Sequence, residues 1–124
     1  TTPQDIALLD AQKGLEMFRK VDVPILGVVE NMAVHICAKC GYEEHIFGFR
    51  ESTNPLLNND TPILAKLPLD ICIRENGDSG EPTVIAQPKS EITKRFKTAA
   101  MMIVDALESN SDSEDFPEIT VSDD

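Results

Sequence analysis

The sequence predicts an α/β fold: an open, mostly parallel sheet flanked by helices. Residues 23–30 and 62–67 are short, continuous apolar runs rich in Val, Ile and Leu, which is typical of strands buried on both faces of a parallel sheet. Residues 2–20 and 90–107 carry apolar residues at helical spacing. The order helix, strand, loop, strand, helix is the pattern of an open α/β sheet.

The first expected helix runs from about residue 2 to Lys20. Thr2 is a suitable N-cap residue, Pro3 suits the first helical position, and Asp5 favours the positive end of the helix dipole. A helix that opens at the start of an α/β pattern, with no strand before it, indicates that the upstream half of the domain lies outside this sequence. The apolar residues at helical spacing are Ile6, Ala7, Leu9, Ala11, Leu15, Met17 and Phe18.

The middle of the chain alternates buried strands with polar loops. The strand at 23–30 leads into a cysteine-bearing loop at 32–47, expected to contain a small hairpin. Residues 48–61 are polar and hold the breakers at 54–55 and 58–60. The second strand, 62–67, is expected to stop at Pro68, before a loop at 69–82 on the carboxyl side of the sheet and a short extended piece at 83–86.

The last helix is expected to begin after the N-cap Ser90 and to end near Leu107. Residues 108–124 contain seven acidic residues and no basic one, so residues 1–107 carry only −4 of the net charge of −11. The domain is therefore expected to end at 107, with 108–124 as an acidic, disordered tail. The residues expected to face inward from this helix are Ile92, Phe96, Ala99, Ala100, Ile103 and Leu107.

Composition excludes several classes of function. The net charge of −11 argues against a nucleic-acid binder, because phosphate contacts need clustered Lys and Arg. No apolar run is long enough to span a membrane, and no signal peptide opens the sequence. The three cysteines form an odd set, which predicts reduced thiols in the cytoplasm and not a disulfide framework.

The residues with the clearest chemistry are Cys37 and Cys40, two residues apart in a loop that comes after a buried strand. Two such thiols can point at one metal ion or cluster, but they supply only half of a four-sulfur shell. The remaining ligands must come from a second copy of the chain, from another protein, or from nearby His35 and His45. The last option corresponds to a Cys2His2 zinc site in a structural interaction module without nucleotide binding.

Other polar residues have simpler interpretations. Cys72 lies among apolar residues and is expected to be a buried small hydrophobe. Asp70, Arg74 and Asp78 are expected to form salt bridges or to face water, and no catalytic residue is assigned. Asn31, at the end of the first strand, can cap the strand by bonding to nearby backbone.

With these segments laid out, the chain resembles the C-terminal half of the Mrp/ApbC family of iron–sulfur cluster carrier ATPases, which are deviant P-loop proteins related to MinD. The resemblance covers residues 1–107 in the right order and spacing, and a C-x-x-C directly after V-E-N-M is more specific than either motif alone. The matching segments are 1–7 (TTPQDIA), 28–32 (VVENM), 35–41 (HICAKCG), 46–48 (IFG), 67–69 (LPL), 74–75 (RE), 77–82 (GDSGEP) and 88–91 (PKSE).

The resemblance implies roles for five residues. Cys37 and Cys40 match the pair that binds the cluster, and one [4Fe–4S] cluster is expected to bridge a homodimer. Asn31 matches the asparagine that reads adenine in related ATPases, and Pro68 and Leu69 match the segment that packs around the base. The implied function is iron–sulfur cluster transfer to apoproteins, coupled to binding and hydrolysis of magnesium ATP.

The chain also departs from the family pattern. The phosphate-binding loop of the G-K-G-G-V-G-K-S type is absent from the 124 residues, as are the acidic residues that position magnesium and water. Because a P-loop wraps backbone N–H groups and a lysine around the phosphates, ATP hydrolysis is expected only of a full-length family member. Residues 49–51 (FRE) replace the family's small glycines. A MinD-like partitioning ATPase shares the sheet but does not need the C-x-x-C.

Overall fold

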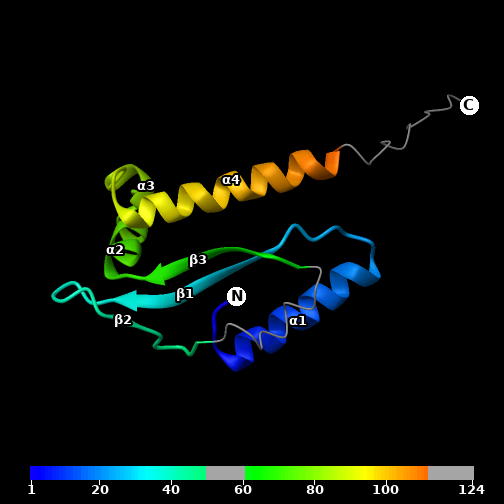
Figure 1. Ribbon diagram of the computed structural model, residues 1–124, viewed down its shortest axis with the longest axis horizontal. Coiled ribbons are helices and arrows are strands. Elements are labelled where there is room, and N and C mark those ends of the chain that lie inside the picture. The colour runs from blue at the N-terminus through cyan, green and yellow to red at the C-terminus, as the bar shows by residue number, and fades with distance from the viewer. Residues whose placement is uncertain (50–60, 112–124) are drawn as a thin grey trace, which may run out of the picture.

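The computed structural model describes residues 1–49 and 61–111, and the chain forms an α/β structure with a small three-stranded sheet (Figure 1). Among these residues no helix is long and apolar enough to cross a membrane. The elements are α1 (Asp5–Lys20), β1 (Val28–Ile36), β2 (Glu43–Glu44), β3 (Ile63–Leu69), α2 (Ile71–Ser79), α3 (Thr83–Ala86) and α4 (Glu91–Ser111).

The sheet is mixed, with β1 in the centre and strand order β2-β1-β3. β1 runs parallel to β3 and antiparallel to the two-residue β2, which pairs with His35 and Ile36. Figure 1 shows α4 on one side of the strands and α1 on the other, so the arrangement is layered as expected for an α/β fold. Of the two strand pairings, the longer is parallel and the short one antiparallel, so the described sheet shows an α/β arrangement but does not confirm the open, mostly parallel sheet that the sequence predicts.

The first residue of the chain extends the hydrogen bonding of β1. The Thr1 amino group donates to Val29 O (2.9 Å), and Asn31 N–H donates to Thr1 O (2.7 Å). This pair of bonds has the pattern of a parallel bridge. It lies on the edge of β1 opposite to β3.

A bulge interrupts β1 at Asn31. Glu30 pairs with Lys66 and Val34 pairs with Pro68, so β1 uses two more residues than β3 over the same length of sheet. Met32 takes a positive φ of 56° there, and its N–H is held by the Asn31 side-chain oxygen at 2.9 Å. The extra residues bend the strand and redirect its second half, which positions the end of β1 and its cysteine loop.

Fewer apolar residues of α1 are buried against the sheet than the sequence predicts. Leu8 packs against Val28, with Ala11 and Leu15 beside them. Ile6 is 73% exposed, and the other apolar residues expected at helical spacing but found exposed are Leu9, Met17 and Phe18. The start of α1 is also later than expected: Gln4 is the N-cap residue, and the Thr2 hydroxyl donates to the Gln4 side chain.

The first strand begins five residues later than predicted and continues into the expected cysteine loop. Pro24 lacks the N–H that a strand ladder needs, and the ladder starts only where Val28 N–H donates to Pro62 O at 2.8 Å. The expected small hairpin is confirmed as the β1–β2 turn. Pro68 does not end the second strand but lies inside β3, at the edge of the sheet formed by the described residues, where proline is tolerated.

Two segments expected to be irregular or extended are helical. Residues 71–79 form α2, which starts because the Asp70 side chain accepts from Cys72 N–H at 2.9 Å and ends with Gly80 in a left-handed C-cap. The predicted extended piece at 83–86 is the short helix α3. Asp70 is a typical N-cap residue and Gly80 a typical C-cap residue, and the nine residues between them are enough for a short helix. The prediction of a loop at 69–82 overlooked these two signals.

The N-cap of the last helix is confirmed, because Ser90 Oγ accepts from Thr93 N–H at 3.1 Å. α4 extends to Ser111, past the predicted end near Leu107, and Leu107 is 52% exposed and not inward. Ala100 is exposed as well. The predicted tail after 111 and the polar segment at 50–60 lie outside the described residues.

Candidate functional site

The two thiols lie at the tip of the β1–β2 hairpin. Cys37 N–H donates to Tyr42 O at 2.9 Å, and this bond closes a loop of four residues that contains Cys40. Inside the loop, Gly41 N–H donates to Cys37 O at 2.8 Å, with Gly41 at φ 71°. Because a residue with a Cβ is strained at such a φ, the glycine after the second cysteine is needed for this turn.

The loop favours the ionised form of its first thiol. Backbone N–H groups of Lys39 and Cys40 bond to the Cys37 sulfur and lower its pKa, with smaller contributions from the Cys40 thiol and the nearby His35. Both cysteines are free thiols, Cys37 half-buried and Cys40 exposed. Because thiolates are the metal-binding form of cysteine, the pair fits a soft metal or an iron–sulfur cluster reached from solvent.

The two histidines beside the pair are occupied by the backbone. His35 Nδ1 lies 3.1 Å from Leu69 O, and His45 Nδ1 lies 2.9 Å from Ala33 O. Since a carbonyl only accepts, each Nδ1 carries the proton and donates. Within 1–49 and 61–111, no group of three or more His, Cys, Asp and Glu side chains is placed to hold a metal ion, so these residues do not assemble the Cys2His2 site considered from the sequence.

The three residues linked to nucleotide binding are not gathered at one point. Asn31 is exposed at the bulge, and its side-chain oxygen bonds to Met32 N–H, as expected of a residue that caps a strand. Pro68 is buried and Leu69 half-buried, and they pair with Val34 and His35 beyond the bulge. Leu69 therefore lies beside the base of the cysteine hairpin.

A charged cavity that sequence reasoning missed lies beside the hairpin. Its volume is about 230 Å³, and Glu30 lines it with a side chain only 6% exposed. Lys66 and Arg95 line the same cavity. The contacts given for these two cations are with other groups: Lys66 Nζ lies 6.0 Å from the centre of the Phe49 ring, and Arg95 donates to Lys66 O. A glutamate inside an otherwise apolar strand was the available signal, because buried carboxylates need special surroundings.

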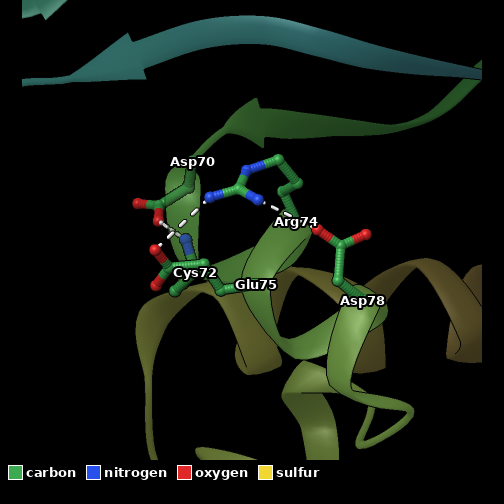
Figure 2. Close-up of polar contacts among 5 residues, drawn as sticks. All are labelled: Asp70, Cys72, Arg74, Glu75 and Asp78. Carbon is green, nitrogen blue, oxygen red and sulfur yellow. Dashed lines mark hydrogen bonds and ion pairs between the residues drawn. The ribbon is translucent and has the colours of Figure 1, made fainter.

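The polar residues of α2 have structural roles. Figure 2 shows Arg74 between Glu75 and Asp78, with Nη1 2.9 Å from Asp78 and Nη2 3.4 Å from Glu75. All three side chains are exposed, so these ion pairs contribute little stability. Asp70 serves as the N-cap of the helix. The prediction of salt bridges at Arg74 and Asp78 is confirmed.

The third cysteine differs chemically from the pair. Cys72 is half-buried on α2. Burial, with a hydrogen bond to Asp70 and its negative charge, raises the pKa of Cys72 from 9.0 to about 11. Its thiolate population below pH 9 is therefore lower than that of an ordinary thiol by about 100-fold, which fits a packing role and not a ligand role.

Thiol alkylation across pH should separate these cysteines. A raised pKa keeps Cys72 neutral, so its reaction with iodoacetamide should stay slow through neutral pH and rise until about pH 11. The lowered pKa of Cys37 should bring its rate to a plateau at lower pH. Peptide mass spectrometry after timed alkylation measures each rate. Equal rates for the two cysteines at neutral pH would contradict these assignments.

Comparisons with known proteins agree on one family. A family model described as a NUBPL iron-transfer P-loop NTPase of the ParA group matches residues 1–104. An iron–sulfur cluster carrier protein of Pseudomonas fragi is 54% identical over 101 residues, which cover 82% of this chain and 35% of the relative. The carrier protein of the same name from Escherichia coli K12 is 52% identical over 100 residues, covering 81% of this chain and 27% of the relative.

A eukaryotic relative gives the same picture. The mouse iron–sulfur cluster transfer protein NUBPL is 46% identical over 110 residues, covering 89% of this chain and 34% of the relative. The chain thus spans about a third of the length of the curated relatives it matches.

Proposed function

Because the chain belongs to the family of NUBPL-type iron-transfer P-loop NTPases, we propose that it binds an iron–sulfur cluster through Cys37 and Cys40 and delivers it to apoproteins. The observation that carries the proposal is the hairpin itself. It presents two free thiols at its tip, and backbone N–H groups lower the pKa of Cys37. The relatives named as cluster carrier and cluster transfer proteins support the same function.

The proposed cargo is one [4Fe–4S] cluster shared between two copies of the chain. Such a cluster takes four thiolates, and one hairpin offers two. A two-fold axis through the cluster brings the same two thiols from a second copy, which is the usual symmetry of homodimers. Shared ligation at an exposed seam is also reversible, since a change in dimer geometry weakens iron binding without breaking either chain's fold.

We further propose that ATP binding and hydrolysis in the longer protein drive this change. The 124 residues hold no phosphate-binding loop of the G-K-G-G-V-G-K-S type and span about a third of the relative's length, so this loop and the magnesium ligands would belong to the remaining part of the longer protein. Within this chain, Asn31, Pro68 and Leu69 are the proposed contacts to the base. Calorimetric titration of ATP into the full-length protein, with and without Asn31→Ala, tests this assignment.

The wider architecture follows from the same proposal. Residues 1–107 would form the C-terminal part of an open, mostly parallel P-loop NTPase sheet, supported by the parallel bridge between Thr1 and β1. Because α4 continues to Ser111, the acidic tail proposed to lie outside this domain is residues 112–124 and not 108–124. The reduced thiols favour the cytoplasm, and fractionation with an antibody tests that location.

Anaerobic reconstitution tests the proposed function. The protein is incubated with ferrous iron, sulfide and a reductant, desalted, and analysed for visible absorbance, iron and sulfide content, and mass in solution. We expect a brown dimer with about four iron atoms per two chains. Incubation with an apoprotein that carries a four-cysteine cluster site should then move the colour to that protein.

Two outcomes contradict the proposal. A colourless, redox-silent protein that binds Zn²⁺ with the same thiols would support the structural zinc module, because Zn²⁺ has a filled d shell. A brown protein that retains its cluster in the presence of the apoprotein would bind the cluster as a resident cofactor and not as cargo.

A further inference from the structure

We propose that His35 is a positioning residue that couples the junction between β3 and α2 to the thiol pair. The junction is defined here as Leu69, the last residue of β3, and Asp70, the N-cap of α2. This coupling would control the site, and its functional meaning rests on the proposed cluster transfer. The mechanical link between the junction and the hairpin does not itself require bound iron.

The imidazole of His35 holds the junction directly. His35 and Leu69 are register partners in the parallel pairing of β1 and β3. In addition to this backbone pairing, the His35 Nδ1–H donates to Leu69 O at 3.1 Å. The next residue, Asp70, fixes the first turn of α2 through Cys72 N–H at 2.9 Å. A rotation of α2 about its N-terminus therefore displaces the carbonyl that His35 holds.

The same residue leads into the cysteine loop. His35 and Ile36 are the last two residues of β1, and both pair with β2. Cys37 comes directly after them, with its N–H bonded to Tyr42 O. The path from the Leu69 carbonyl to the first thiol thus runs through one hydrogen bond and two residues of strand.

The second histidine provides an internal comparison. His45 Nδ1–H donates to Ala33 O at 2.9 Å, so this hydrogen bond ties the segment after β2 to β1 and not to the junction of β3 and α2. The His45 ring also lies 4.5 Å from the Phe49 ring. Both rings stiffen the hairpin, but of the two only His35 connects it to the junction. This difference separates coupling from simple stiffening.

The coupling can be measured on the iron-free protein with a double-mutant cycle. Asp70→Ala removes the side-chain cap of α2 and disturbs the junction, while His35→Leu removes the donor to Leu69 O. Amide hydrogen exchange at Cys37 and Gly41, measured by NMR, reports opening of the hairpin. The four proteins of the cycle are compared with His45→Leu, alone and combined with Asp70→Ala, and with His35→Asn, whose amide nitrogen can replace Nδ1 as donor.

We expect Asp70→Ala to speed exchange at Cys37 about fivefold in the native background, since a lost N-cap costs about 1 kcal/mol. In the His35→Leu background, Asp70→Ala should add less than about twofold, whereas its effect should persist in His45→Leu. His35→Asn should restore the sensitivity. The interaction between the two sites is then non-additive, as expected for residues in one network.

An equal effect of Asp70→Ala in the native and His35→Leu backgrounds would overturn the proposal, as would loss of the effect in His45→Leu. Far-UV circular dichroism checks that each variant is folded, and His35→Ala, which also lacks the donor to Leu69 O, takes the place of His35→Leu in the cycle if His35→Leu is not folded. Because all measurements use apoprotein, failure of the coupling is distinct from failure of cluster binding, which reconstitution tests separately.

Discussion

Replacing Cys37 or Cys40 by serine is expected to reduce bound iron after anaerobic reconstitution by at least about tenfold, with loss of the brown colour. Serine preserves the size of the side chain but replaces a soft sulfur ligand with a hydroxyl that binds iron–sulfur clusters poorly. Both residues lie on the solvent-accessible hairpin, where substitutions usually change the free energy of unfolding by no more than about 0.5 kcal/mol. The variants should therefore stay folded.

Cys72→Ser is the matched control for this experiment. Cys72 lies on α2 and has a raised pKa, so its thiol is not expected to take part in binding. Iron content, absorbance and dimer mass should match those of the native protein. Iron binding that survives in Cys37→Ser, or that disappears in Cys72→Ser while the fold is retained, would refute the assignment of the ligand pair.

Gly27→Ala is expected to lower the free energy of unfolding by about 1–3 kcal/mol. A Cβ at Gly27 would lie 2.5 Å from Leu64 Cγ and 2.7 Å from Pro62 O. The backbone oxygen cannot move alone, because Val28 N–H donates to it where β1 and β3 first pair. The methyl group would therefore push apart the two strands that hold the sheet together.

Gly14→Ala is the control, since it makes the same chemical change inside α1 with no atom within 4 Å of the new Cβ. Alanine in a helix interior is more favourable than glycine by about 0.5–1 kcal/mol, so this variant should be more stable than the native protein. Urea unfolding of both variants, monitored by circular dichroism, measures the two changes. Similar midpoints for the two variants would show that β1 and β3 do not approach so closely at Gly27.

Short-range signals in the sequence predicted much of the fold. The Ser90 cap located the start of α4, and the apolar runs located the two main strands. Strand ends were less accurate, because a ladder begins where a partner is available and not where apolar residues begin. Asp70 and Gly80 show that caps were present but were outweighed by a turn-like composition.

The sequence predicted which cysteines form the candidate site, but it did not predict how the neighbouring residues are arranged around them. The spacing of Cys37 and Cys40 and the motifs around them indicated the family that the comparisons later showed. The pairing of Leu69 with His35 and the burial of Glu30 were not foreseen. The pairing of Leu69 with His35 depends on the register between β1 and β3 beyond the bulge, where two extra residues of β1 bring His35 opposite Leu69.

By itself, the sequence determined the chemistry available to this protein: a thiol pair, its glycine-assisted turn, the helices that caps define, and its family. The thiol pair, the turn and the helix caps each depend on residues that lie within about one helical turn or one loop of each other in the sequence. Only the tertiary structure decided that His35 holds Leu69 and that the chain packs too closely at Gly27 for a side chain. Such contacts join residues far apart in the chain, and their geometry is set by strand register and packing, which local composition does not encode.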